Sequence, residues 1–344
     1  MFTRQAGAGM SLSLADVMAA ANRIAGMAVQ TPMIPSPFMS GVAGTEFLMK
    51  LETCQPTGAF KLRGAANAIA QLPGYAAGVT CCSTGNHGRA VAYAAHRRGL
   101  RAVICMSSLV PSNKVEAIRS LGAETHIAGR SQDEAGLESR RLAQEEDLVE
   151  IPPFDHEAVI AGQGTAALEM LAERPDIATL LVPLSGGGLA AGVALAAKAI
   201  KPSIRVIGVT MERGAAMHAS IAAGKPVEVE EVASLADSLG GGIGLSNRFT
   251  FALCRDLLDD VILVSEDEIY RAMQALFFED RLVAEGASVV GLAAVMSGKA
   301  GRLAGPVATL ITGRNVDMGQ FMAVTAGEPV DLGGIRTGGG AHGT

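Results

Sequence analysis

Short apolar runs alternate with longer amphipathic segments along most of the chain. The pattern is clearest in GVTCCSTGNHGRAVAYAAHRRG (78–99), RAVICMSSLVPSNKVEAIRSLG (101–122) and ATLLVPLSGGGLAAGVALAAKAI (178–200). In each, an apolar run of strand length precedes a loop rich in Gly, Ser or Thr and then a helical pattern. Strands that alternate with helices predict parallel sheets that are covered by helices on both faces.

The strand–helix units fall into two groups. Residues near 78–152 hold about three units, bounded by the turn-rich stretches LPGYAAG and IPPFDH, and the other predicted strands lie outside this block. We therefore expect an α/β fold with two parallel-type twisted sheets and flanking helices. A small domain (77–153) is inserted in a larger domain (1–76 and 154–330), and the glycine-rich end (331–344) is expected to be a flexible tail.

The composition agrees with this fold class and argues against nucleic-acid binding, a membrane span and a disulfide framework. Of the 344 residues, 49% are hydrophobic, 42 are glycine and none is tryptophan, as in α/β proteins with tight turns. The net charge is −6 without a basic patch, so we expect no nucleic-acid partner. Apolar runs are shorter than the ~18 residues of a membrane span. The odd number of cysteines, five, argues against a disulfide framework, and no leader pattern precedes the first helix, so we expect a cytoplasmic protein.

A glycine loop at residues 185–188 suggests a phosphate site. Ser185, Gly186, Gly187 and Gly188 lie between a predicted strand and a predicted helix, where free amide groups suit an anion. The alternative is a tight turn that packs the helix against the sheet. The pattern G-x-G-x-x-A also occurs there, and again within AGQGTAALEM (161–170), which leaves a dinucleotide site open.

Two polar stretches add candidate chemistry. In ETCQPTGAFKLRGAANAI (52–69), Lys61 stands at a predicted helix start, where the helix dipole disfavours a cation. Either Lys61 points into water or it is not an ordinary cation. In STGNHGRAVA (83–92), small polar residues precede a helix, which suits a carboxylate; the alternative is an N-capping cluster with Ser83 or Thr84 as the cap.

Six motifs in order resemble the threonine/serine dehydratase family of pyridoxal-phosphate (PLP) enzymes, which has the tryptophan-synthase β-like fold (fold type II). The motifs are PTGAFKLRGA, STGNHGRAVA, AGQGTAALE, SGGGLAAG, VAEGASVVGLAA and TGRNVD. The match runs from about residue 20 to residue 325. It implies PLP in a cleft between two domains, an amino acid as substrate, and a homodimer or higher homo-oligomer.

The resemblance also implies roles by position. Lys61 would hold PLP as a Schiff base and later act as the base at Cα. Asn86 would bind the 3-hydroxyl of the cofactor and Thr312 would face its ring nitrogen, while amides of the glycine loop bind its phosphate. The full set implied at the cofactor is Lys61, Phe60, Asn86, Gly186, Gly187, Gly188, Leu189, Glu285 and Thr312.

The backbone N–H groups of Ser83, Thr84, Asn86 and His87 would hold the substrate carboxylate. Thr84 is also implied to be catalytic, because racemases of this family place a serine there as the acid opposite the lysine. Threonine is bulkier and stiffer, so we expect racemisation to be disfavoured. Arg314 stands where the family usually has glycine, and it either contacts an anionic group of the substrate or points outwards.

Many relatives have a divalent-cation site that this sequence lacks. The corresponding strand end reads GVTMERGAAMH (208–218), with Thr210 at the acidic position. Glu212 and His218 offer too few hard oxygen ligands for Mg²⁺ or Ca²⁺, so we expect no metal there. The ~100–150 residues of a C-terminal regulatory domain are also missing, so we expect no feedback regulation of the biosynthetic type.

A neutral hydroxyl at the ring nitrogen favours elimination over transamination. We therefore expect a PLP-dependent dehydratase (ammonia-lyase) that converts a β-hydroxy amino acid into a 2-oxo acid and ammonia. The stretches TGRNVDM and MERGAAMHA resemble the hydroxyectoine-utilisation branch, which implies a hydroxyectoine-derived substrate or a hydroxylated diaminobutyrate. The alternatives are L-threonine, L-serine or 3-hydroxyaspartate as substrate, a nicotinamide-dependent oxidoreductase, and a non-catalytic PLP or amino-acid binding module.

Overall fold

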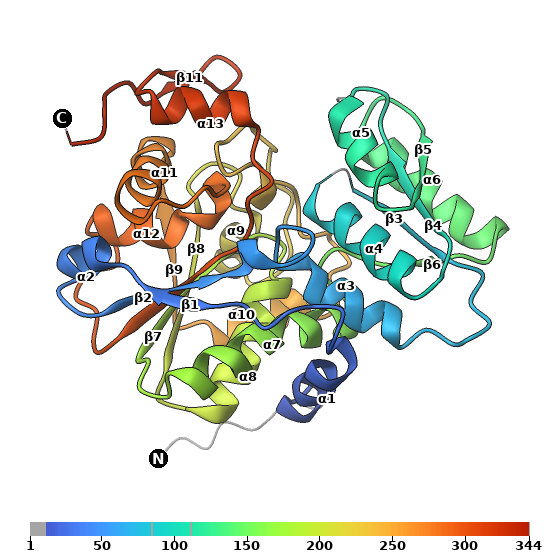
Figure 1. The fold of residues 1–344 in the computed structure, drawn as a ribbon, viewed down its shortest axis with the longest axis horizontal. Coiled ribbons are helices and arrows are strands. Elements are labelled where there is room, and N and C mark those ends of the chain that lie inside the picture. The colour runs from blue at the N-terminus through green and yellow to red at the C-terminus, as the bar shows by residue number, and fades with distance from the viewer. Residues whose placement is uncertain (1–11, 84, 111, 344) are drawn as a thin grey trace.

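The computed structural model describes residues 12–83, 85–110 and 112–343 and contains two main sheets (Figure 1). The large sheet has the strand order β1-β2-β10-β7-β8-β9. Its strands are β1 (Met33–Pro35), β2 (Phe47–Leu51), β10 (Val307–Ile311), β7 (Thr179–Pro183), β8 (Arg205–Met211) and β9 (Asp260–Val264). All neighbours are parallel except β1, which pairs antiparallel with β2 at the edge.

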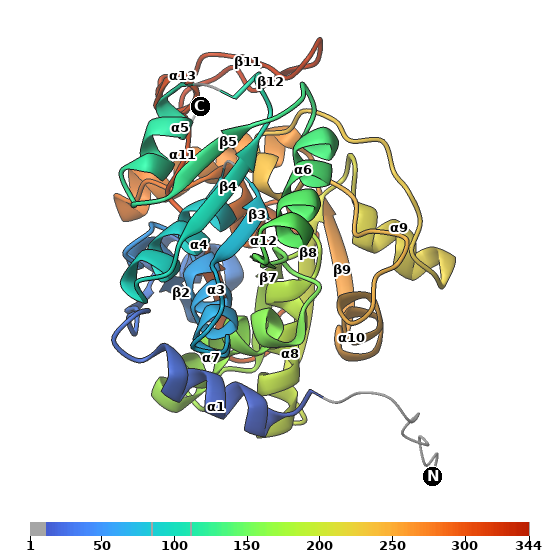
Figure 2. The ribbon, with the colours of Figure 1, turned by 90° about the vertical axis from the view of Figure 1, so that its right-hand side faces the viewer.

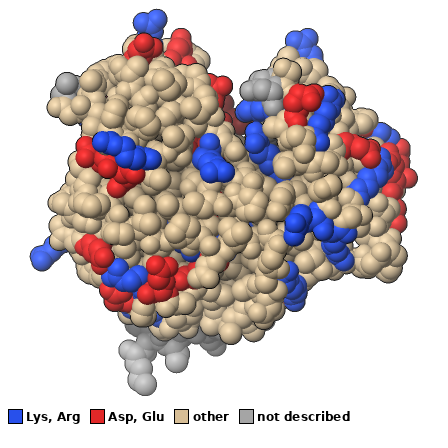
Figure 3. Space-filling view, in the orientation of Figure 1, with Lys and Arg blue, Asp and Glu red and all other residues tan. Residues whose placement is uncertain are grey.

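The small sheet is parallel throughout and has the order β5-β4-β3-β6. Its strands are β5 (Glu124–Ile127), β4 (Ala102–Met106), β3 (Val79–Cys82) and β6 (Val149–Glu150). It lies beside the large sheet, and the space-filling view shows a notch between the two parts (Figures 1 and 3). The expected α/β class with parallel-type sheets is confirmed; the predicted domain boundaries stay a prediction.

Helices cover both faces of each sheet. One face of the large sheet carries α1 (Leu14–Ile24), α7 (Glu157–Glu173), α8 (Gly188–Ile200), α9 (Ala216–Ala223) and α10 (Thr250–Leu257). The other face carries α2 (Pro37–Ala43), α11 (Glu266–Asp280), α12 (Val290–Met296) and α13 (Met318–Thr325). Around the small sheet lie α3 (Lys61–Ala70), α4 (Asn86–Arg97) and α5 (Ser112–Arg119), with α6 (Gln132–Glu145) on the opposite face (Figure 2).

Central strands read as continuous apolar runs because both of their faces are covered. Every residue of β4, β7 and β10 is buried. Ser265 and Glu268 form a capping box at the start of α11. The described residues also form three single-turn helices: η1 (Glu52–Cys54), η2 (Asp237–Leu239) and η3 (Gly286–Ser288).

One glycine pattern is not a ligand loop. Gly162 and Gly164 lie inside α7, so the dinucleotide interpretation of AGQGTAALEM is wrong. A Cβ on Gly162 would lie 2.5 Å from the carbonyl oxygen of Arg63, and one on Gly164 would lie 2.7 Å from that of Gly192. These glycines allow α7 to pack closely against α3 and α8.

The end of the chain packs against α11. The strands β11 (Val330–Asp331) and β12 (Arg336–Thr337) pair antiparallel. The Thr337 hydroxyl donates to Asp267 (2.6 Å) and the Gln274 amide donates to the carbonyl of Gly340 (3.0 Å). These contacts differ from the expected free tail, whose flexibility in solution stays a prediction.

Candidate active site

Lys61 is the first residue of α3 and is largely enclosed by protein. Its Nζ donates a hydrogen bond to the carbonyl oxygen of Pro153 (2.8 Å), in the segment that leads from β6 to α7. Burial lowers the pKa of this amine from 10.5 to about 8, since no carboxylate offsets the loss of solvation. The interpretation of Lys61 as an outward-pointing surface cation is therefore wrong.

The end of β10 fixes the backbone in front of Lys61. Ala59 and Gly313 form an antiparallel bridge, and the Phe60 N–H donates to the carbonyl of Thr312 (2.9 Å). The N–H of Arg314 donates to the carbonyl of Gly58 (3.0 Å). Gly58 has φ +76°, a conformation that favours glycine. Segments far apart in sequence are thus held together at the reactive lysine.

A buried carboxylate joins three further segments. Glu285 precedes η3, and both of its oxygens accept hydrogen bonds from Asn86 Nδ2 (3.0 and 2.9 Å). It also accepts from the N–H of Asn315 (2.8 Å) and from the Ser238 hydroxyl (3.2 Å). Burial raises the pKa of Glu285 despite these donors. Asn86 Oδ1 in turn accepts from Asn315 Nδ2 (2.6 Å), so the Asn86 amide has a fixed orientation.

Thr312 is buried and has a hydroxyl partner. Its Oγ1 lies 3.0 Å from Oγ of Ser288, and Ser288 also accepts from the N–H of Gly313 (2.9 Å). Ser288 was not singled out in the sequence, although it lies within VAEGASVVGLAA. The predicted contact of Thr312 with a ring nitrogen stays a prediction.

The glycine loop joins β7 to α8 where predicted. Gly187 is the N-cap of α8 with φ +91°, so the N–H groups of the first helical turn, beginning at Gly188 and Leu189, lack partners within the helix. A Cβ on Gly186 would lie 2.5 Å from the ring of Phe154, and one on Gly188 would lie 3.0 Å from Cα of Phe154. Because Phe154 follows Pro153, the loop and Lys61 meet at the same short segment.

His87 lies in the first turn of α4 and is buried. Its Nε2 lies 2.7 Å from the carbonyl of Ile151 and therefore donates, which leaves Nδ1 as an acceptor. Nδ1 is buried and has no partner among the described residues. Burial, together with Lys61 nearby, lowers the pKa of His87 to about 3, so this side chain is neutral.

The remaining predicted residues have different outcomes. Ser83 is half-buried but does not cap α4, because the N-cap is Gly85 without a side-chain bond. Arg314 exposes its side chain at the edge of the site. Thr84 lies outside the described residues, so both of its predicted roles stay predictions.

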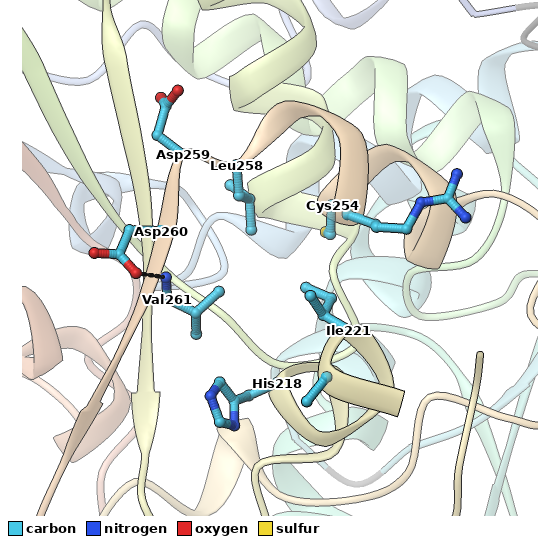
Figure 4. A pocket seen from close by; sticks show the side chains of 9 residues that line it. His218, Ile221, Cys254, Leu258, Asp259, Asp260 and Val261 are labelled. Atoms are coloured by element: carbon cyan, nitrogen blue, oxygen red, sulfur yellow. Dashed lines mark hydrogen bonds between the residues drawn. The ribbon is translucent and has the colours of Figure 1, made fainter. Parts of the chain in front are cut away.

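No metal ligand set is formed by the described residues. His218 faces a separate cavity of about 270 Å³ behind the glycine loop, whose other wall includes Cys254 (Figure 4). Asp260 turns its carboxylate back to the N–H of Val261 (2.8 Å), away from His218. Glu212 is exposed.

Sequence reasoning missed a buried charge cluster beside Lys61, formed by Lys50, Glu52, Arg63 and Glu169. Arg63 donates to both oxygens of Glu52 (2.8 Å each) and to both oxygens of Glu169 (2.6 and 2.8 Å). Lys50 pairs with Glu169 at 2.6 Å. No sequence pattern links these distant residues.

Comparisons with known proteins agree with the geometry. Residues 24–313 match the family described as "Pyridoxal-phosphate dependent enzyme". The "Putative threonine dehydratase" of Sinorhizobium fredii is 54% identical over 92% of this chain and 96% of its own. The "L-threonine ammonia-lyase" of Geobacter sulfurreducens is 39% identical over 84% of this chain and 72% of its own. The solved structure of maize serine racemase has a TM-score of 0.86 at 35% identity, over 91% of this chain and 96% of that chain.

The described residues fit the phosphate, ring and aldehyde of PLP. The N–H groups at the start of α8 have no partners within the helix, and a phosphate would satisfy them. The buried acceptor Nδ1 of His87 would take a donor group of a bound molecule. The lowered pKa of Lys61, about 8, increases the fraction of its amine in the neutral, nucleophilic form. The match to this family also contradicts the nicotinamide alternative. Within the described residues, no helix is long and apolar enough to cross a membrane.

Proposed function

Since this chain belongs to the pyridoxal-phosphate-dependent enzyme family, and within it to the threonine/serine dehydratases, we propose that it removes water from a β-hydroxy amino acid to give a 2-oxo acid and ammonia. It is a PLP-dependent lyase. Loss of a proton from Cα and of hydroxide from Cβ forms water and an enamine. Hydrolysis of the imine tautomer consumes one water and releases the 2-oxo acid and ammonia.

The observation that carries this proposal is the amine of Lys61, buried and held at Pro153 next to the glycine loop. Bound PLP would supply the electron sink for the negative charge at Cα. Lys61 would hold the cofactor and, once free, accept the Cα proton, because its lowered pKa leaves part of the amine neutral near pH 7. The N–H groups at the start of α8 would bind the phosphate.

Neighbouring side chains would orient the reactants. Glu285 fixes the amide of Asn86, which would bind the 3-hydroxyl of the cofactor. Ser288 holds the hydroxyl of Thr312, the group assigned to the ring nitrogen. As a neutral partner, Thr312 would not enforce protonation of that nitrogen, which favours elimination over transamination. Backbone N–H groups in residues 83–87 would bind the substrate carboxylate.

For the physiological substrate we propose a hydroxyectoine-derived or hydroxylated diaminobutyrate. The support is the sequence of TGRNVDM and MERGAAMHA, which differs from the general dehydratases at Arg314 and Thr210. L-threonine is the second candidate, because the Geobacter relative named for it is 39% identical. The other candidates are L-serine and 3-hydroxyaspartate.

Two measurements test the proposal. The purified protein should gain a visible absorption band of covalently bound cofactor on addition of PLP, and Lys61→Ala should lack it. A panel of 3-hydroxy-2,4-diaminobutyrate, L-threonine, L-serine and 3-hydroxyaspartate is then scored for ammonia and 2-oxo acid. Fastest turnover of L-threonine would overturn the substrate but leave the reaction class. Turnover of no member, with the band present, would favour a binding module.

A further inference from the structure

A cavity of about 450 Å³ lies beside the segment that accepts the hydrogen bond of Lys61, between the small sheet and residues 243–247. Its wall includes Cys82 at the end of β3, Glu150 at the end of β6, and Pro153 and Phe154. Pro153 accepts the hydrogen bond of Lys61, Phe154 packs on the glycine loop, and Cys82 directly precedes the loop assigned to the substrate carboxylate. The cavity is therefore joined to the candidate active site through the contact of Pro153 with Lys61 and the contact of Phe154 with the glycine loop.

Glu150 is an unusual member of this wall because its carboxylate is half-buried and unpaired. None of the described residues gives it a hydrogen bond, and none places a cation within ion-pair distance. Arg140 of α6 lines the same cavity and attracts this carboxylate only at longer range. Burial raises the pKa of Glu150 despite that attraction. A carboxylate in this position is stabilised by a ligand that brings a hydrogen-bonding cation.

Asp155, the other acidic residue of the cavity wall, differs from Glu150 because backbone N–H groups donate hydrogen bonds to its carboxylate. Its oxygens accept from the N–H groups of Arg248, Phe249 and Thr250 at 2.7, 2.9 and 2.9 Å. These bonds anchor the start of α10 and leave little acceptor capacity for a ligand. The unpaired negative charge of the cavity is thus on Glu150.

The separation suits a short side chain. Glu150 lies three residues before Pro153, so their Cα atoms are at most about 10 Å apart. A substrate whose Cα meets Lys61 Nζ would need to extend only a few atoms past Pro153 to bring a terminal group near Glu150. A methyl group would leave the carboxylate unpaired, and an acidic side chain would be repelled by it.

We propose that the cavity receives the substrate side chain and that Glu150 binds a terminal ammonium group on it. This inference rests on the proposed function and narrows its substrate to β-hydroxy amino acids that carry a second amino group. Glu150 is then a specificity-determining residue, whereas Lys61 and the glycine loop serve any substrate of the class.

The test separates binding from turnover. With PLP-loaded enzyme at pH 7.5, calorimetry compares L-2,4-diaminobutyrate with L-2-aminobutyrate, neither of which carries a β-hydroxyl group. The diamino ligand should bind more tightly, Glu150→Gln should weaken it about 10- to 100-fold, and Glu150→Asp should retain part of the preference. The neutral ligand should change less than about twofold. Glu173→Gln, on the exposed end of α7, is the matched charge control.

Turnover gives the second readout. The value of kcat/KM for 3-hydroxy-2,4-diaminobutyrate should fall in Glu150→Gln while that for L-threonine is kept. An unchanged ratio of the two ligands or substrates in Glu150→Gln would overturn the inference, as would a preference for 3-hydroxyaspartate that Arg140→Gln abolishes. If Glu150 governs binding but no β-hydroxy amino acid is consumed, the proposed function fails and the ammonium site stands.

Discussion

Lys61 and Arg63 are cations two residues apart in the first turn of α3, and their surroundings shift their pKa values in opposite directions. Burial lowers the pKa of Lys61 to about 8. Burial alone would also lower the pKa of Arg63, but the carboxylates of Glu52 and Glu169 raise it. The side chain of Arg63 is only 1% exposed, so depth of burial does not explain the difference. Carboxylate partners do.

The two residues therefore have different tasks. The cluster of Lys50, Glu52, Arg63 and Glu169 balances two positive charges with two negative ones, and it ties α3 to the end of β2, to η1 and to α7. Lys61, two residues earlier in α3, has no carboxylate partner among the described residues, so its amine can lose its proton and react.

Removal of the paired cation should have the largest effect on stability. Arg63→Met leaves the fully buried Glu52 without its partner and should lower the free energy of unfolding by about 3–5 kcal/mol. The measurement is denaturant unfolding of the PLP-free protein at pH 7. Arg174→Met is the matched control, because Arg174 binds Glu46 and Asp176 at the surface and should cost less than about 1 kcal/mol. Equal losses would contradict the assigned importance of burial.

Glu285 allows the comparison to be repeated with a buried acid. Glu285→Gln turns an N–H₂ group toward the donors of Asn86 and Asn315, so we expect a loss of about 1–3 kcal/mol and weaker PLP binding. Unfolding and cofactor titration by fluorescence measure the two effects. Glu266→Gln is the control, since one oxygen of Glu266 accepts from the Leu235 N–H and the other has no partner among the described residues. A similar loss in both variants would show that the donors around Glu285 are unimportant.

Features that depend on the local sequence could be predicted. The parallel strands were predictable because burial on both faces produces continuous apolar runs such as those of β7 and β10. The short edge strand β1 was missed, since it has three residues and ends in Pro35, and β2 and β6 were not predicted either. Lys61 and the glycine loop stood out as polar or glycine-rich interruptions at helix starts.

Pairing between distant residues could not be predicted in the same way. Arg63 resembles any helical arginine, and nothing near it in the sequence indicates Glu52 and Glu169 as partners. The roles of Ser288 and Glu150 also follow only from their neighbours in space. Ser288 contacts the hydroxyl of Thr312, and Glu150 lines a cavity in which its carboxylate has no hydrogen-bond partner among the described residues.

The smallest effect should come from Lys61 itself and should depend on pH. In the PLP-free protein, the pKa of Lys61 is lowered to about 8 in the folded state, compared with 10.5 when unfolded. Below pH 8 both states are protonated and the folded state bears the full penalty of a buried ammonium. Between pH 8 and 10.5 the unfolded state binds more protons, so this penalty fades as pH rises.

Lys61→Met should thus be more stable than the wild type by about 1 kcal/mol at pH 7, with a smaller gain at pH 10. Unfolding at both pH values measures the gain, and Arg63→Met should show a loss that does not change, because Arg63 stays protonated throughout. A gain for Lys61→Met that is equal at pH 7 and pH 10 would mean that the amine is solvated and ordinary.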